Sequence, residues 1–190
     1  KDSPSLNADA QTSWLEIDND YTGYNSIFNL TPIQIMRISL GHEYFHGIQY
    51  GYKGNFGNNA YFYEMSSMWI EDVILPEGND YLENTWVGDL LDNPEGDFDD
   101  RYPPSCNNCV GQGYELALFG HYLSKHIDPL GSIDQKQSTI MRKIWQEYHD
   151  SYNSFNNYDK PLEVIDRVLQ SDYSISFIEA WADFISRNLY

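Results

Sequence analysis

The chain has 190 residues, enough for one domain with a substantial hydrophobic core, and 29 acidic residues outnumber 11 basic ones. The resulting net charge of −18 excludes a protein that follows nucleic-acid phosphates and argues against binding to anionic membranes. No apolar run approaches the length needed for membrane insertion. We therefore expect residues 1–190 to form a single, monomeric domain.

A helix is predicted to begin just after Leu30. Thr31 suits the N-cap, Pro32 suits the first helical position, and Gln34 can complete a capping box. Apolar residues and histidines then recur at helical spacing until a glycine-rich stretch weakens the pattern. We expect this helix to end between Tyr50 and Tyr52.

The predicted helix contains a His-Glu-x-x-His segment formed by His42, Glu43 and His46. Residues four apart share a helix face, so both imidazoles can bind one metal ion, and Glu43 can reach a metal-bound water. This combination is typical of zinc-dependent peptidases. The alternative is a chance match on an amphipathic helix, which three fixed residues of uncommon type should give in about one sequence in a hundred or fewer.

A catalytic zinc normally takes three protein ligands and leaves one position for water, so a third ligand is needed. A second amphipathic helix is predicted over residues 60–74, where Glu64 has only aromatic and apolar neighbours. Glu71 lies two turns further on, about 10 Å away, so one ion cannot easily bind both. We take Glu64 as the third ligand and Glu71 as a supporting or structural residue. For Glu71 and Asp72 a solvated helix face is an equally good interpretation.

A His-Glu-x-x-His segment followed by a helix-borne glutamate resembles the gluzincin clan of zinc metallopeptidases. Four segments, EIDNDYTGY, GHEYFHGIQYGY, YFYEMSSMWIEDVILPEGNDYL and SFIEAWADFISRNL, resemble secreted bacterial metalloproteases of the myxobacterial type. The resemblance implies that His42, His46 and Glu64 bind zinc, that Glu43 is the general base, and that peptides or proteins are the substrate. It also implies a secreted or extracellular bacterial protein, and that residues 14–18 form the edge strand of an active-site sheet.

The resulting fold class is α+β and mostly helical, with a zincin-like active-site helix, a small N-terminal sheet and a helical C-terminal subdomain. Only about thirty residues precede the active-site helix, so we expect a minimal catalytic domain or a fragment of a longer protein.

Two departures from the gluzincin pattern leave a second interpretation open. Met68 stands where thermolysin-like members often carry a carboxylate that orients a histidine, and Met65 to Ser67 replace small residues. The alternative is a catalytically inactive, zinc-binding zincin-like module for adhesion or recognition. The intact Glu43 favours the peptidase.

Helices are further predicted over residues 110–126, 132–151, 161–169 and 176–189. A peptidase also needs a donor for the oxyanion of its tetrahedral intermediate. Four residues are candidates, and Tyr114 is favoured because a tyrosine opens the helix after the active-site region in several gluzincins. The other three are His121, His126 and His149.

Two remaining segments carry residues that could bind metals or each other. Residues 89–100 are acidic and contain glycine and proline, which predicts a loop. This loop could hold Ca²⁺, but it lacks the EF-hand spacing, and a solvated acidic loop is the better interpretation. Cys106 and Cys109 have no second pair to complete a zinc site, so we expect a local disulfide, with free thiols as the alternative.

Overall fold

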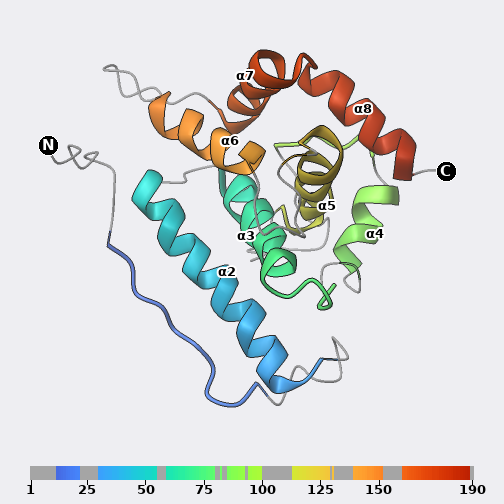
Figure 1. Ribbon diagram of the computed structural model, residues 1–190. Coiled ribbons are helices and arrows are strands. Elements are labelled where there is room, and N and C mark those ends of the chain that lie inside the picture. Colours follow the sequence, from blue (N-terminus) through green and yellow to red (C-terminus); the bar gives the residue numbers. More distant parts are fainter. Residues whose placement is uncertain are drawn as a thin grey trace, which may run out of the picture.

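The computed structural model describes residues 12–21, 30–54, 59–79, 82, 85–92, 94–99, 113–128, 130, 139–151 and 160–188. Over these ranges the backbone is helical or irregular and contains no β-strand (Figure 1). The predicted α+β class with a small N-terminal sheet is therefore wrong for the described part of the chain. Residues 12–20, which include the expected edge strand 14–18, are an exposed irregular segment, and no described strand lies beside them to complete a ladder.

Nine helical elements follow one another along the chain. They are α2 (Pro32–Tyr52), α3 (Ala60–Ile74), α4 (Thr85–Asp92), the 3₁₀ turn η3 (Tyr114–Leu116), α5 (Ala117–Tyr122), the π-helical turn η4 (Leu123–Ile127), α6 (Thr139–Asp150), α7 (Pro161–Tyr173) and α8 (Phe177–Asn188), counted over the described residues. The bounds of α2 and α3 confirm the two helices predicted around the His-Glu-x-x-His segment.

Helix α2 begins as its sequence predicts. The backbone N–H of Thr31 donates to Gln34 Oε1 at 3.0 Å, and Pro32 occupies the first turn, where its missing N–H costs nothing. The helix then runs for 21 residues. It packs against α3, which places both histidines of the motif beside Glu64 of that helix.

Helix α3 is the centre of the fold and lies between α2 and α5 (Figure 1). Most of its side chains are buried, including Phe62, Met65 and Trp69. They join a core built largely of aromatic rings, in which Phe62 stacks on Trp145 of α6 with ring centroids 4.5 Å apart. A helix buried on nearly all sides is held rigidly, so a ligand such as Glu64 on α3 has a fixed position.

The later helices differ from prediction mainly at their ends. Between residues 113 and 127 the expected single helix is a 3₁₀ turn, a short α-helix and a π turn, and α7 continues to Tyr173. Helix α8 opens as expected, with the Ser176 backbone N–H bonded to Glu179 Oε2 at 2.9 Å. The loop predicted over residues 89–100 is wrong at its start, because residues 85–92 are helical and bury Leu90 completely.

Candidate metal centre

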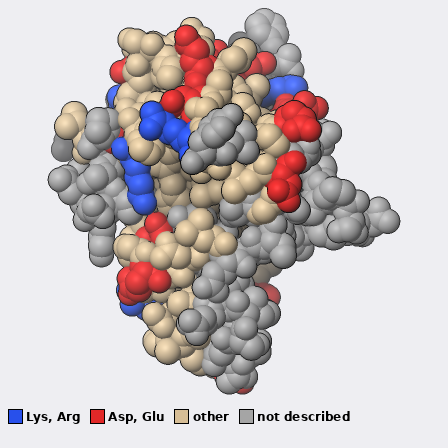
Figure 2. Space-filling model, turned by 90° about the vertical axis from the view of Figure 1, so that its right-hand side faces the viewer, with Lys and Arg blue, Asp and Glu red and all other residues tan. Residues whose placement is uncertain are grey.

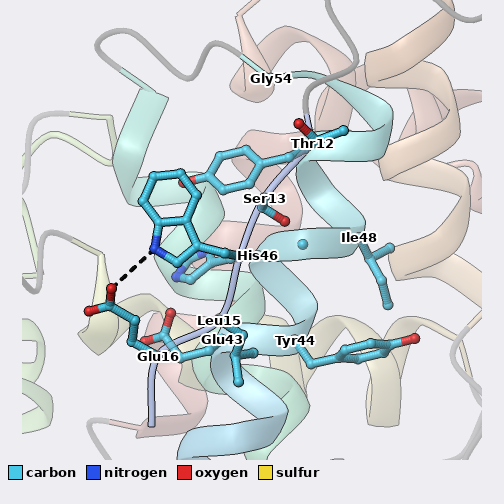
Figure 3. A pocket seen from close by; sticks show the side chains of 12 residues that line it. Thr12, Ser13, Leu15, Glu16, Glu43, Tyr44, His46, Ile48 and Gly54 are labelled. Carbon is cyan, nitrogen blue, oxygen red and sulfur yellow. Dashed lines mark hydrogen bonds between the residues drawn. The ribbon is translucent and has the colours of Figure 1, made fainter.

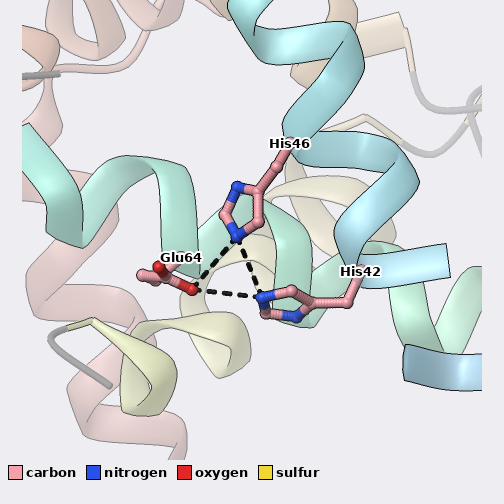
Figure 4. A group of neighbouring side chains, drawn as sticks. All are labelled: His42, His46 and Glu64. Carbon is pink, nitrogen blue, oxygen red and sulfur yellow. Dashed lines mark hydrogen bonds and ion pairs between the residues drawn. The ribbon is translucent and has the colours of Figure 1, made fainter. Parts of the chain in front are cut away.

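Helices α2 and α3 bring His42, His46 and Glu64 to a single point (Figure 4). The two Nε2 atoms of the histidines lie 3.0 Å apart. Glu64 Oε2 lies 3.2 Å from His42 Nε2 and 3.5 Å from His46 Nε2. In the part of the chain that the structure describes, these three residues are the one group of His, Cys, Asp and Glu side chains with this convergence.

The separations of these three atoms fit a metal ion. Zinc ligands lie about 2.0–2.2 Å from the ion and are arranged tetrahedrally, which places any two of them roughly 3.3–3.5 Å apart. The observed 3.0, 3.2 and 3.5 Å are close to this range. Two imidazole nitrogens and one carboxylate oxygen are also a donor set of catalytic zinc. The residues present therefore fit the ion that the sequence predicts.

The outer nitrogens of both histidines have partners that fix the orientation of the rings. His42 Nδ1 lies 2.5 Å from Glu71 Oε1, and both side chains are buried. His46 Nδ1 lies 2.7 Å from Gln49 Oε1 and 3.2 Å from Ser67 Oγ. When Nδ1 donates its proton to an oxygen, Nε2 keeps its lone pair for a metal, so these partners select the ligating tautomer.

Glu71 thus supplies the carboxylate that is missing at Met68. It lies seven residues after Glu64, two helical turns along the same face of α3, which brings it level with His42. The interpretation of Glu71 and Asp72 as a solvated face is wrong, because they are only 6% and 4% exposed. Met68 itself is buried against Ala117, and Tyr114 packs against this pair.

Gln49 is a supporting residue that the sequence analysis did not single out. It is buried, and its side-chain N–H groups donate to the backbone oxygen of Tyr63 and to the hydroxyls of Ser66 and Ser67, at 2.9 to 3.1 Å. These bonds turn its Oε1 toward His46. Its position one turn after His46 lets it reach that ring, but its burial and its partners on α3 follow only from the packing of the two helices.

Without a cation, the neighbouring charges move the pKa values of His42 and Glu64 away from their ordinary values. Burial lowers the pKa of His42, but hydrogen bonds to Glu64 and Glu71 outweigh it and raise the value to about 10. Burial of Glu64 acts to raise its pKa, but hydrogen bonds with His42 and His46 lower the value to about 2. The buried carboxylates therefore stabilise positive charge at the point where the ligand atoms meet.

Glu43 lies beside this point and faces an open cleft with a volume of about 850 Å³ (Figure 3). The cleft lies between α2 and residues 12–16, which run alongside the helix. Its walls include Trp14, Tyr44 and Tyr50, together with Glu43 and one ligand, His46. The edge strand expected over residues 14–18 is absent, yet residues 12–16 still lie beside His46 as one wall of the cleft.

Of the four candidate oxyanion donors, only Tyr114 lies next to His42, His46 and Glu64 in the part of the chain that the structure describes. Its ring centroid is 5.8 Å from that of His42, and burial together with the charges of Glu64 and Glu71 raises its pKa. A tyrosine that stays protonated keeps the hydrogen with which its hydroxyl donates, here toward Glu64. The other three lie elsewhere: His121 near Asp72, His126 near Tyr122, and His149 near Tyr52.

Gly113 fixes the position of Tyr114. It has a φ of +95°, and a Cβ at this residue would lie 2.3 Å from the backbone oxygen of Tyr61. Only glycine tolerates both the left-handed backbone and this contact, which presses the start of η3 onto α3. The closeness of Tyr114 to the cluster therefore depends on a backbone conformation as well as on its side chain.

Several expectations concern residues or partners beyond this cluster. Cys106 and Cys109 lie outside the described residues, and so does most of the region around them. The described part of residues 89–100 forms no group of converging ligands for Ca²⁺. Acidic side chains are spread over separate places on the face shown in Figure 2. Among the helices that the structure describes, none is both long and apolar enough to cross a membrane.

Comparison of the chain with protein-family models, characterised proteins and solved structures gives no match. The structure defines a His-His-Glu group beside an open cleft. Any function assigned to this group therefore depends on its geometry alone.

Proposed function

We propose that this protein is a zinc-dependent endopeptidase. The observation that carries the proposal is the convergence of His42 Nε2, His46 Nε2 and Glu64 Oε2, with Glu43 between the two histidines in sequence and facing the cleft. Zinc held by these three residues would lower the pKa of a bound water and polarise a peptide carbonyl.

The chain's own residues supply the rest of the chemistry. The Glu43 carboxylate accepts a proton from the attacking water and delivers it to the leaving amine. The Tyr114 hydroxyl donates a hydrogen bond to the oxyanion of the tetrahedral intermediate. Glu71 and Gln49 hold the two imidazoles in place, so neither ring has to reorient during the reaction.

The cleft supports a peptide substrate because it is large, open and lined by mixed polar and apolar groups. Tyr44 and Ile48 of α2 and Trp14 of the facing segment offer apolar contacts, while Thr12 and Ser13 of that segment offer hydroxyls. An extended peptide needs both kinds of contact, one for its side chains and one for its backbone. A deep, enclosed pocket would instead select a small molecule.

The test combines metal analysis with cleavage of a peptide library by the purified protein. We expect one zinc ion per chain, and cleavage that stops when a chelator removes the metal and returns when zinc is added. Glu43→Gln should keep the zinc and the fold but lose cleavage by a factor of about 10²–10⁴, because an amide cannot accept the proton.

The matched control is Glu77→Gln, the same substitution at an exposed residue after α3, which should cleave like the parent. A Glu43→Gln variant that cleaves as fast as the parent would show that Glu43 is not the base. Stoichiometric zinc with no cleavage of any peptide would overturn the enzyme and leave the inactive zinc-binding module. Absence of bound metal after zinc loading would overturn both.

A further inference from the structure

A second cavity lies on the side of α2 that faces away from the cleft. It has a volume of about 270 Å³, lies between α2, α3 and α6, and is partly open to solvent. Its walls are almost entirely apolar, and two polar side chains, Gln49 and Arg142, also contact it. The apolar lining residues are Phe45, Ile48, Tyr52, Trp69, Ile70, Val73, Met141 and Trp145.

The cavity is separate from the proposed active site. At 100° per residue, Phe45, Gln49 and Tyr52 point nearly opposite to Glu43 and Gly47, which line the cleft. The His42 and His46 side chains project between these two directions, toward α3. The two places adjoin, because Ile48 lines both and Gln49 of the cavity wall contacts His46, but the cavity opens on a different side of α2 from the cleft.

The size and the walls of the cavity suit a single aromatic ring with a short chain. An apolar cavity of roughly 150 Å³ already accepts benzene, so 270 Å³ leaves room for two or three further atoms. The wall rings of Phe45 and Trp145 meet edge to face, with centroids 6.5 Å apart and an interplanar angle of 88°. Rings in this arrangement present both faces and edges, which is how aromatic groups prefer to contact a further ring.

Arg142 gives the cavity a charge preference. It is exposed on α6, and its neighbours there are already paired, Lys143 with Asp172 at 2.5 Å and Glu147 with Arg167 at 2.8 Å. No carboxylate among the described residues lies within ion-pairing distance of Arg142. A guanidinium at the edge of an apolar cavity favours a carboxylate, which it can bind with two parallel hydrogen bonds, and this local contact must outweigh the repulsion from the net charge of −18.

We propose that this partly open cavity between α2, α3 and α6 binds a small aromatic carboxylic acid, with the ring between Phe45, Trp69 and Trp145 and the carboxylate on Arg142. The inference does not depend on the peptidase proposal, because it concerns other residues and is tested by binding alone.

The experiment compares 3-phenylpropionate with its uncharged analogue 3-phenylpropanamide, by calorimetry and by saturation-transfer NMR on the full chain. We expect the acid to bind and the amide to bind about tenfold more weakly. Arg142→Gln should weaken the acid about tenfold and leave the amide unchanged, because only the acid uses the charge. Arg37→Gln, at an exposed arginine of α2 that does not line the cavity, is the matched control and should bind like the parent.

A second variant tests the location. Ile70→Trp fills the half-buried edge of the cavity and should abolish binding of both compounds, with circular dichroism confirming that the helices remain. The compounds are tested at about 1–10 mM, the range of weak ligands, and in about tenfold excess over the protein. The proposal is overturned if neither compound shows saturation transfer. Equal affinity for acid and amide would overturn the assignment of the carboxylate to Arg142, and unchanged binding in Ile70→Trp would overturn the location.

Discussion

Replacing Glu71, whose carboxylate contacts His42 Nδ1, should weaken zinc binding without altering a proposed ligand. In Glu71→Gln the amide oxygen can still accept the Nδ1 proton, so the ring stays in place, but the negative charge 2.5 Å from Nδ1 is lost. A hydrogen bond to a charged group is worth about 1.5–3 kcal/mol, compared with about 0.5–1.5 kcal/mol for a neutral one. The difference of roughly 1–1.5 kcal/mol corresponds to about a fivefold to tenfold loss of zinc affinity.

Glu71→Ala removes the bond as well as the charge and should cost more. Removing the partner of a ligating histidine typically lowers metal affinity by about 10–100-fold. The assay is competition for zinc with a chromophoric chelator, which measures affinity without any peptide substrate. We therefore expect the order parent, Glu71→Gln, Glu71→Ala, from tightest to weakest.

The control is Asp72→Asn, the next residue on α3. Asp72 is as buried as Glu71, but its carboxylate lies near His121 instead, with Oδ2 3.9 Å from Nδ1. This variant can lower the melting temperature, yet it should bind zinc within about twofold of the parent. Equal losses of zinc affinity in Asp72→Asn and Glu71→Gln would show that general destabilisation, and not the bond to His42, sets the affinity.

Three further predictions concern other parts of the site. Tyr114→Phe should keep zinc and lower kcat more than it changes KM, since the hydroxyl acts on the oxyanion; equal activity in the two proteins would remove Tyr114 from the mechanism. Gly113→Ala should destabilise the fold by about 2–3 kcal/mol in denaturant unfolding, because of its positive φ and its contact with Tyr61, whereas Gly88→Ala in open space on α4 should not destabilise. The raised pKa of His42, about 10, means that metal-free protein holds a proton there at neutral pH, which a metal must displace. Zinc affinity should thus rise about tenfold per unit between pH 7 and pH 9, and chelator competition showing no rise would contradict this.

Local patterns in the sequence were sufficient for the two helices that carry the site. Thr31, Pro32 and Gln34 set the start of α2 through contacts within one turn of chain, and these do not depend on the rest of the protein. The spacing of His42 and His46 then places both rings on one face, because helix geometry is the same in every protein. The choice of Glu64 on α3 also agrees with the cluster that the structure forms.

Contacts between segments that are distant in the sequence could be known only from the tertiary structure. Residues 14–18 have an extended pattern, but a strand exists only with a partner, and no described segment provides one. Glu71 could equally have faced solvent, since its sequence neighbours do not show that His42 of another helix lies 2.5 Å away. The same holds for Gln49 and for Tyr114, whose places follow from the packing of α2, η3 and α3. Local helix geometry thus placed the two proposed histidine ligands on one face, whereas the residues that orient them were decided by contacts between helices, which no local pattern encodes.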